Sequence, residues 1–252
     1  MIASSRLQGS SKGARLGAMS AKGTPSFRCV DLDIPKGLAP IEAAGLVERA
    51  ADLGIRSVSV PAASATAAHA ALRGRTSVSI SCEEVVDWPG DSLLLHVGER
   101  LQGHLADELV IPVGHELLGD ASWCGSKLRK VLSRCHALGV FANIVVDVQG
   151  LNVAELRALV RGVARMSVNA LTLEMGKHGE VSHELVGAAV DEAKGRVPVR
   201  VAARAISPSR LERLCDLGVQ SVVVSPQGLS SLLMESTEGP GAEGSAARSL
   251  VA

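Results

Sequence analysis

Two acidic residues stand at the ends of apolar runs, where they could work together as an acid and a base. Asp147 follows a β-branched run, and Glu174 ends an alternating one. Two carboxyl groups held close together separate their pKa values, so that one can donate a proton while the other accepts one. The alternative is a structural salt bridge in which Arg200 or Arg204 pairs with these carboxylates. The sequence leaves both interpretations open.

The run from Ala170 to Glu174 has the alternation of a strand with one face toward a cavity. If Leu171 and Leu173 point outward into helices, Ala170, Thr172 and Glu174 share the inward face, because successive side chains of a strand point in opposite directions. Thr172 and Glu174 would then face the mouth of the site. Both are therefore candidate catalytic residues.

Further polar residues stand at or just after other predicted strands. They are Asp31, Asp33, His115, Glu116, Arg204 and Ser225. The histidines have neither HExxH nor another metal-ligand spacing, so we expect them in loops or on the surface and expect no metal site. They include His96, His104, His115, His178 and His183. No GxSxG or GxxxxGK[ST] motif occurs and no GxGxxG follows the first strand, so no cofactor is expected.

The elements that must position these residues follow a repeating pattern. Short β-branched runs alternate with stretches of helical period, which favours a parallel sheet with helical crossovers. The predicted strands are Cys29–Asp33, Ile55–Pro61, Thr76–Ser81, Glu108–Val113, Val140–Asp147, Val168–Glu174, Val197–Ala203 and Val219–Ser225. Eight such units with apolar residues on both faces predict an α/β fold of the (β/α)8 TIM-barrel type, with its site at the carboxyl ends of the strands. An open doubly wound sheet is the alternative.

Composition narrows the classes of partner. Basic and acidic residues balance at 26 each and aromatic residues make up 2% of the chain, which argues against nucleic-acid binding. The five cysteines show no CxxC pairing, as is typical of reduced thiols, so we expect a cytoplasmic location. No apolar run is long enough to cross a bilayer, so no membrane association is expected. The oligomeric state stays open, with a homodimer among the options.

Both ends of the chain lack an apolar period. Residues 1–27 are basic and rich in serine and glycine, and residues 235–252 are rich in glycine, serine, alanine and glutamate. We predict flexible tails there, with one barrel domain over residues 28–234. An organellar transit peptide is the alternative for the basic tail.

Several short motifs, in order, resemble those of deoxyribose-phosphate aldolases. The segment Asp107-Glu-Leu-Val110 with the later Gly119-Asp120 resembles that family's DEID and GD, and Ile144-Val-Val-Asp147 resembles its VIIE. Gly176-Lys177 resembles the end of its KTSTGK, and Gly228-Leu-Ser-Ser-Leu-Leu233 resembles its GASSLL. The similarity spans residues 29 to 234, and it implies a TIM barrel with class I aldolase chemistry.

The same resemblance implies that the family's catalytic groups are replaced. A class I aldolase forms an imine between a lysine amine and the substrate carbonyl. Laying Gly176-Lys177 on the family's GK puts Thr172 at the position of that lysine, and threonine cannot form an imine. The family's second lysine falls near Val201 and its catalytic aspartate at Val110.

The resemblance also implies that the segments with which this family holds phosphate are retained. Loops after the seventh and eighth strands of such barrels offer backbone N–H groups to an anion. The candidate phosphate-binding residues are Gly176, Lys177, Arg204, Gly228, Ser230 and Ser231. The alternative for the two serines is ordinary capping of a helix. The partner implied is a small phosphorylated ligand.

Three functions remain open. The first is an altered carbon–carbon lyase acting on a small phosphorylated sugar or carbonyl compound, with Glu174, Asp147, Lys177 and Thr172 as catalytic candidates. The second is a catalytically inactive homologue that binds a ligand as a regulator or scaffold. The third is a changed reaction, such as isomerisation, that needs only the carboxylates.

Overall fold

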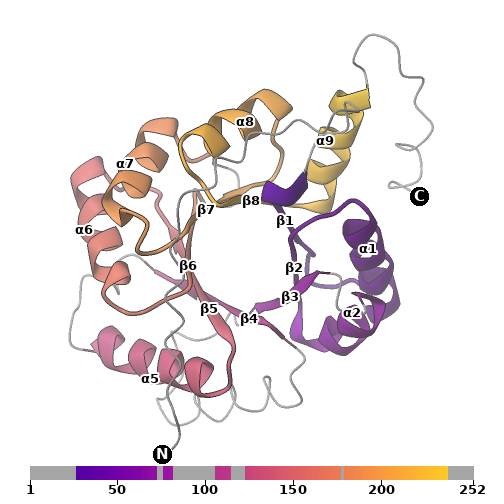
Figure 1. Ribbon diagram of the computed structural model, residues 1–252, viewed down its shortest axis with the longest axis horizontal. Coiled ribbons are helices and arrows are strands. Elements are labelled where there is room, and N and C mark those ends of the chain that lie inside the picture. The colour runs from indigo at the N-terminus through magenta and orange to yellow at the C-terminus, as the bar shows by residue number, and fades with distance from the viewer. Residues whose placement is uncertain (1–26, 73–75, 82–105, 115–122, 177–178, 238–252) are drawn as a thin grey trace, which may run out of the picture.

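The computed structural model describes residues 27–72, 76–81, 106–114, 123–176 and 179–237. Within these ranges parallel strands form the inner wall of a barrel and helices surround them (Figure 1). The predicted positions at His115, Glu116, Lys177 and His178 lie outside the described residues. His96 and His104 lie outside them as well.

The strands follow the predicted runs closely. They are β1 (Val30–Asp33), β2 (Ser57–Val60), β3 (Ser77–Ser81), β4 (Glu108–Val113), β5 (Phe141–Asp147), β6 (Ala170–Glu174), β7 (Val199–Ala203) and β8 (Ser221–Val224). Each strand pairs in parallel with the next, and β8 pairs back onto β1 to close the barrel. The predicted parallel α/β barrel is confirmed, and an open sheet is excluded.

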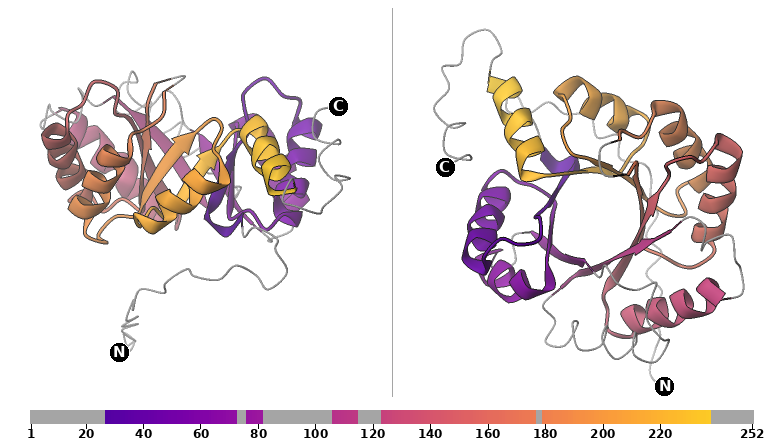
Figure 2. Two further views of the ribbon diagram at one scale, coloured as in Figure 1. Left: turned by 90° about the horizontal axis from the view of Figure 1, so that it is seen from above. Right: turned by 180° about the vertical axis from the view of Figure 1, so that it is seen from behind.

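Helices surround most of the barrel, from α5 through α9 to α1 and α2, in the views of Figure 2. They are α1 (Pro40–Asp52), α2 (Ala65–Leu72), α5 (Trp123–Ala137), α6 (Val153–Ala164), α7 (His183–Ala193), α8 (Pro208–Asp216) and α9 (Pro226–Thr237). Short 3-10 turns, η1 (Phe27–Cys29) and η2 (Ala62–Ser64), precede β1 and α2. Helix α9 includes the first three residues of the predicted C-terminal tail, which starts at residue 235. No helix in the described ranges is long and apolar enough to span a membrane.

Local signals in the sequence set where helices begin and end. Ser207 accepts a hydrogen bond from the backbone N–H of Arg210, and Pro208 takes the first helical position of α8. Asn152 caps α6 in the same way and forms a reciprocal box with Glu155. Gly218 ends the α8 turn with φ of +92°, a conformation that costs glycine little.

The two faces of β6 show how the core is divided. Leu171 and Leu173 are fully buried in the hydrophobic core, whereas Thr172 and Glu174 line the space inside the barrel. The predicted alternation is therefore confirmed. Large apolar side chains fill the layer between sheet and helices, whereas polar residues share the barrel interior with apolar ones such as Val110, Val145 and Val223.

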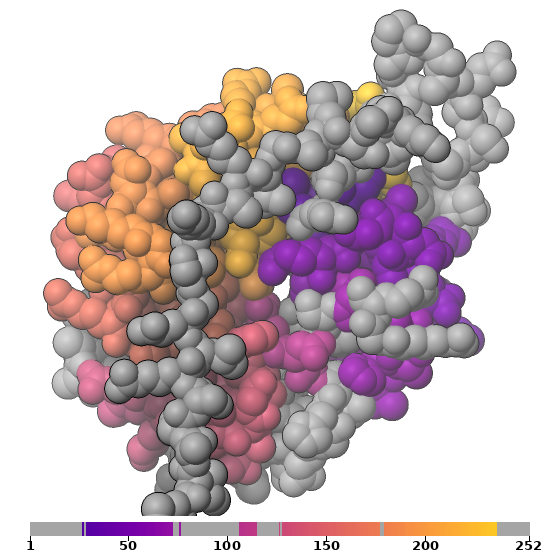
Figure 3. Space-filling view, viewed as in Figure 1, coloured from indigo at the N-terminus to yellow at the C-terminus, as the bar shows by residue number. Residues whose placement is uncertain are grey.

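The barrel closes where the ends of the folded chain meet. Val30 of β1 lies opposite Val222 of β8, so the first and last strands are hydrogen-bonded neighbours. The same juxtaposition is visible in the space-filling view, where indigo and yellow-orange segments adjoin (Figure 3). This seam holds two elements together that are far apart in sequence.

Candidate functional site

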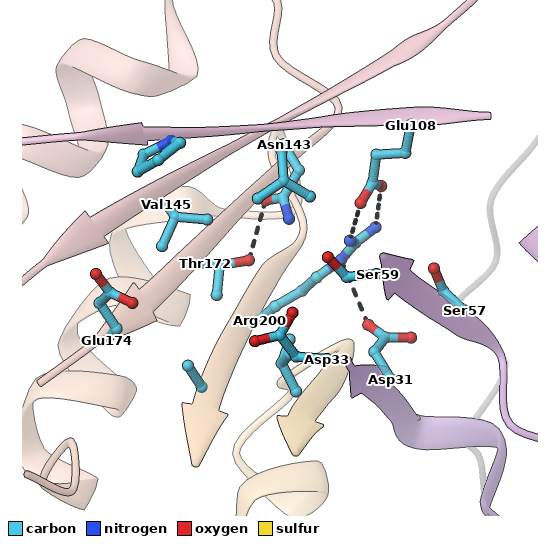
Figure 4. A pocket seen from close by; sticks show the side chains of 14 residues that line it. Asp31, Asp33, Ser57, Ser59, Glu108, Asn143, Val145, Thr172, Glu174 and Arg200 are labelled. Carbon is cyan, nitrogen blue, oxygen red and sulfur yellow. Dashed lines mark hydrogen bonds and ion pairs between the residues drawn. The ribbon is translucent and has the colours of Figure 1, made fainter. Parts of the chain in front are cut away.

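The barrel encloses a cavity of about 330 Å³ that opens into a wider hollow of about 950 Å³. Inward-facing residues of β1, β2 and β4 to β8 line the inner cavity (Figure 4). The wider hollow is bordered by residues at the carboxyl ends of strands, including Asp147, Glu174 and Arg204. This is the end at which barrels of this kind place their sites.

A buried ion pair forms the floor of the inner cavity. Arg200 on β7 donates from Nη1 and Nη2 to the two carboxylate oxygens of Glu108 on β4, at 2.7 Å each. Its Nε donates to Oε1 of Gln220 at 3.1 Å. Burial lowers the pKa of Arg200, but the hydrogen bonds and charge of Glu108, helped by Asp31, more than offset this and raise it. The guanidinium therefore stays charged, and both of its Nη atoms are bound to Glu108.

Asp31 on β1 adds a second carboxylate to this floor. Its Oδ2 accepts hydrogen bonds from Ser221 Oγ at 2.5 Å and from Arg56, and lies 4.0 Å from Arg200 Nε. Within the described part of the chain its buried Oδ1 has no hydrogen-bond partner. Two carboxylates thus share two guanidinium groups, so the floor is nearly neutral.

Thr172 stands where the resemblance puts the imine-forming lysine. Its side chain faces the inner cavity, and its Oγ1 donates to Oδ1 of Asn143 at 3.0 Å. Val110 also lines the cavity, whereas Val201 is buried in the outer core and its neighbours Arg200 and Ala202 face inward. Among the described residues that line either cavity, none is a lysine.

Asp33 and Glu174 lie above this floor and border both cavities. Burial raises the pKa of Glu174, and the negative charges of Asp147 and Asp33 raise it further. Asp33 is open to solvent on one side, but the surrounding protein also raises its pKa by desolvation, against a hydrogen bond from Ser59. Both carboxyl groups therefore hold a proton more tightly than usual.

Asp147 lies beside Glu174, as the sequence predicts. The two are opposite each other in the pairing of β5 with β6. Asp147 Oδ1 accepts hydrogen bonds from the backbone N–H groups of Gln149 and Gly176, at 2.9 Å each, so this carboxylate holds two loops in place. The alternative of a salt bridge from Arg200 is wrong, because Glu108 on the opposite side of the barrel takes that guanidinium.

Asp33 is the acid–base candidate that sequence reasoning did not place in the catalytic set. The signal was present, since Asp31 and Asp33 are two residues apart on a strand and must share a face. The sequence could not show that the charge of Asp33 on β1 reaches Glu174 on β6 and raises the pKa of that carboxyl group. The closed barrel brings both side chains to the lining of the same two cavities.

Only some of the candidate phosphate-binding residues border the wider hollow. Gly176 and Arg204 border the wider hollow, with Ser225 and Gln227 beside them. Ser225 Oγ donates to the Arg204 carbonyl at 2.9 Å and accepts from the Gly228 N–H at 3.2 Å, which ties the start of α9 to the end of β7. Gly228 fits closely against that carbonyl.

Ser230 and Ser231 lie one turn inside α9. Ser230 Oγ donates to the carbonyl of Pro226 at 2.9 Å, and Ser231 Oγ donates to that of Gln227 at 3.1 Å. Such bonds to the preceding turn satisfy a helical hydroxyl locally. These serines therefore neither cap the helix nor border the two cavities, and Ser225 takes the position at the helix entrance.

Most of the polar side chains that line the inner cavity present oxygen atoms, and few present nitrogen atoms. In the described part of the chain no three His, Cys, Asp or Glu side chains are grouped so as to hold a metal ion. The geometry instead offers carboxyl groups of raised pKa above a neutralised arginine floor. Such an arrangement can exchange protons with a bound ligand.

Comparison with known proteins supports the fold. No family model matches the sequence, and no curated protein matches it. Among solved structures, an aldolase named QR15 superposes with a TM-score of 0.69 at 15% identity, covering 79% of this chain and 90% of that one. The carboxyl transferase domain of Rhizobium etli pyruvate carboxylase gives 0.65 at 10% identity, covering 88% and 46%.

A deoxyribose phosphate aldolase from Aeropyrum pernix is also similar. Its TM-score is 0.67 at 13% identity, and the match covers 83% of this chain and 88% of that one. Identities this low show the fold and leave the chemistry to be argued from the site. The chain is thus similar in fold to the deoxyribose-phosphate aldolases and shares their α/β barrel.

Proposed function

We propose that this barrel binds a small phosphorylated carbonyl compound and moves a proton on the carbon next to its carbonyl, with Glu174 and Asp33 as the proton-transfer groups. The observation that carries this proposal is that two carboxyl groups of raised pKa open into one cavity. Raised pKa values bring carboxyl groups toward the range in which they exchange protons efficiently near neutral pH.

The chemistry needs one ionised and one protonated carboxyl group. The ionised group removes the proton from the α-carbon while the other gives its proton to the carbonyl oxygen, which forms an enediol. With an α-hydroxy carbonyl compound, the base then returns its proton to the former carbonyl carbon, and the acid group, now ionised, takes the proton of the neighbouring hydroxyl, which gives the isomeric carbonyl compound. Asp147 favours the protonated form of Glu174, so Glu174 is the acid and Asp33 the base in the first step.

The ligand's charged end belongs in the wider hollow. Arg204 borders it, and the first residues of α9 follow β8 there, where a helix N-terminus favours an anion. The neutral end of the ligand then reaches the carboxyl groups. Arg200 is excluded from a phosphate-binding role because both of its Nη atoms are bound to Glu108.

The proposal is tested by exchange with heavy water. Dihydroxyacetone phosphate and deoxyribose 5-phosphate are incubated with the protein in D2O, and deuterium uptake next to the carbonyl is followed by NMR. We expect exchange by the native chain and a loss of about 100-fold or more in Glu174→Gln and Asp33→Asn. Glu184→Gln, on the exposed start of α7, should retain full exchange. No exchange by the native chain, or full exchange by both cavity variants, would contradict the proposal.

An inactive ligand-binding barrel is the second candidate. Two observations favour it. The guanidinium of Arg200 is bound to Glu108, and among the described residues that line the inner cavity none carries an amine. Calorimetry distinguishes the two: binding of deoxyribose 5-phosphate that Arg204→Ala weakens by about 10-fold, with no deuterium uptake, identifies a binding protein. Borohydride trapping of a carbonyl adduct on Lys177 would instead identify the altered lyase.

A further inference from the structure

The proposed function leaves one buried amide inside the barrel without a role. Asn143 on β5 lines the inner cavity and is 3% exposed. Its Oδ1 accepts a hydrogen bond from Thr172 Oγ1 at 3.0 Å, and Thr172 is 2% exposed. The two side chains are therefore shielded from bulk water and face the space that a ligand would occupy.

The bond from Thr172 decides which end of the Asn143 amide is left for a ligand. A threonine hydroxyl has one proton and donates it here to the amide oxygen, so the amide nitrogen needs another partner. Within the described part of the chain Nδ2 has no hydrogen-bond partner, and it is accessible from the cavity. Figure 4 shows the amide oxygen bonded to Thr172 and the nitrogen beside it pointing into the interior. Asn143 thus presents N–H donors to the cavity.

The charges of the cavity favour the same orientation of the amide. Four carboxyl groups and one guanidinium line it, and both Nη atoms of that guanidinium are bound to Glu108. The nitrogen is the positive end of the amide dipole, and side-chain dipoles orient in the field of the protein. A mainly acidic interior therefore stabilises the amide with its nitrogen inward.

The position of this donor suits the carbonyl oxygen of a ligand. Thr172, to which the amide is bonded, precedes Glu174 by two residues on the inward face of β6, about 7 Å along a strand. Two hydrogen bonds of about 3 Å span nearly that distance, so one oxygen atom between Asn143 and Glu174 can accept from both. A carbonyl oxygen has two lone pairs, which allows Asn143 to hold one while Glu174 protonates the other.

We propose that Asn143 donates from Nδ2 to the carbonyl oxygen of the ligand and to the same oxygen in the enediol, with Thr172 holding the amide in place. This assignment rests on the proposed function, because it takes the same carbonyl compound as the ligand. As the α-carbon loses its proton to Asp33, negative charge grows on the carbonyl oxygen. A fixed N–H donor that is shielded from water stabilises this charge. Asn143 is then a catalytic residue, whereas Thr172, which acts through it, is a positioning residue.

Infrared spectroscopy of a bound ligand tests the contact without the need for turnover. Dihydroxyacetone phosphate labelled with carbon-13 at its carbonyl is added to the full-length chain, and its carbonyl stretching frequency is compared with that of the free compound. We expect the native chain to lower this frequency, because hydrogen bonds draw charge onto the oxygen and weaken the double bond. The shift should be smaller in Asn143→Ala. It should be unchanged in Asn169→Ala, whose amide oxygen accepts from the Ala142 backbone N–H and which borders neither cavity.

The rate of deuterium exchange provides the second test. Asn143→Ala should exchange about 100-fold more slowly than the native chain, while its dissociation constant for the ligand changes by less than about 3-fold, because the donor matters most where charge develops. Thr172→Val should lose about 10-fold in rate, and Thr172→Ser, which keeps the hydroxyl, should recover most of that loss. Asn169→Ala should exchange at the native rate. Circular dichroism establishes that each variant is folded.

The contact and the proton transfer fail in different ways. A frequency shift that depends on Asn143, without deuterium exchange by the native chain, would support the contact and contradict the proton transfer. Exchange that Asn143→Ala does not slow, with a carbonyl frequency that it does not change, would overturn the contact alone. The contact is also overturned if the native chain leaves the frequency of the ligand unchanged or does not bind it. Equal losses in Thr172→Val and Thr172→Ser would remove the positioning role of the hydroxyl.

Discussion

Arg200 and Glu108 hold each other across the inside of the barrel, from β7 to β4, through two hydrogen bonds of 2.7 Å. Their side chains are 7% and 8% exposed, so neither charge is solvated by bulk water. Barrels of this type usually fill this region with layers of branched apolar side chains. Here the ion pair of Arg200 with Glu108 takes the place of one such layer. The positive charge of Arg200 therefore lies below the carboxyl groups of Asp33 and Glu174.

Removal of one partner should therefore be costly. Glu108→Ala leaves the Arg200 guanidinium buried opposite a cavity, and the loss of one member of a buried pair costs about 3–5 kcal/mol. Urea unfolding measures the change in the free energy of unfolding. The double variant Glu108→Leu with Arg200→Met should recover most of the loss, since it leaves no unpaired charge.

An exposed pair provides the control. Arg161 lies 3.1 Å from Glu192, with 49% of its side chain exposed. Arg161→Ala should cost less than about 1 kcal/mol because solvent screens the pair. If Glu108→Ala were as mild as Arg161→Ala, the floor would not be an effectively buried ion pair.

Gly228 controls how α9 meets the end of β7. A Cβ at this position would lie 1.9 Å from the carbonyl oxygen of Arg204, so Gly228→Ala forces the start of α9 away from the hollow. We expect a loss of about 2–4 kcal/mol, the range typical of overpacking at a rigid contact. Thermal unfolding followed by circular dichroism provides the measurement.

Gly162 is the matched position inside α6. A Cβ there meets nothing within 4 Å, so Gly162→Ala should raise stability by about 0.5–1 kcal/mol through helix propensity alone. The two glycine-to-alanine changes are thus expected to have opposite signs. The same sign for both would contradict the close approach of Gly228 to Arg204.

Glu174 should make stability depend on pH. Burial and the charges of Asp147 and Asp33 raise its pKa in the folded chain, so the folded state binds this proton more tightly than the unfolded state. Stability then falls as pH rises from the ordinary carboxyl range through the raised pKa. Glu174→Gln should be more stable than the native chain at neutral pH, and this advantage should vanish near about pH 4.

Urea unfolding at the two pH values measures that difference. Asp191→Asn, on an exposed position of α7, serves as the control and should change stability little at either pH. A Glu174→Gln gain that persisted unchanged at low pH would point to packing as the cause instead of the carboxyl charge.

The fold was predictable because its signals are local. Strands with both faces covered must be apolar on successive residues, and this pattern located β5 and β8 within a few residues. Ser207-Pro208 fixed the start of α8 by capping chemistry. The alternation in β6 assigned Thr172 and Glu174 to the interior, which the cavity lining confirms.

The site was only partly predictable because its pairings are not local. Which carboxylate neutralises Arg200 depends on which strand lies opposite β7, and the sequence suggested Asp147 or Glu174 where the structure has Glu108. The roles expected for Ser230 and Ser231 rested on a motif. A motif match does not show that both hydroxyls donate to backbone carbonyls of the preceding turn of α9, as they do here.

The position of Thr172 allows a direct test of how the interior differs from that of an imine-forming aldolase. Thr172 faces the cavity and pairs in register with Arg200 on β7. An amine introduced there by Thr172→Lys would be desolvated and would lie near a guanidinium group, and both effects lower the pKa of an amine. We expect this variant to form an adduct with deoxyribose 5-phosphate that borohydride traps near neutral pH.

Peptide mapping should find the adduct at position 172 and not on Lys194, whose exposed amine serves as an internal control in the same chain. The native chain should give no adduct in that peptide, because a hydroxyl cannot form an imine. Circular dichroism and the Glu108→Ala benchmark establish that the variant is folded and how far it is destabilised. A folded variant that traps no adduct at position 172 would mean that carbonyl compounds do not reach the floor of the cavity, and the ligand would then have to be handled at the level of Asp33 and Glu174 alone.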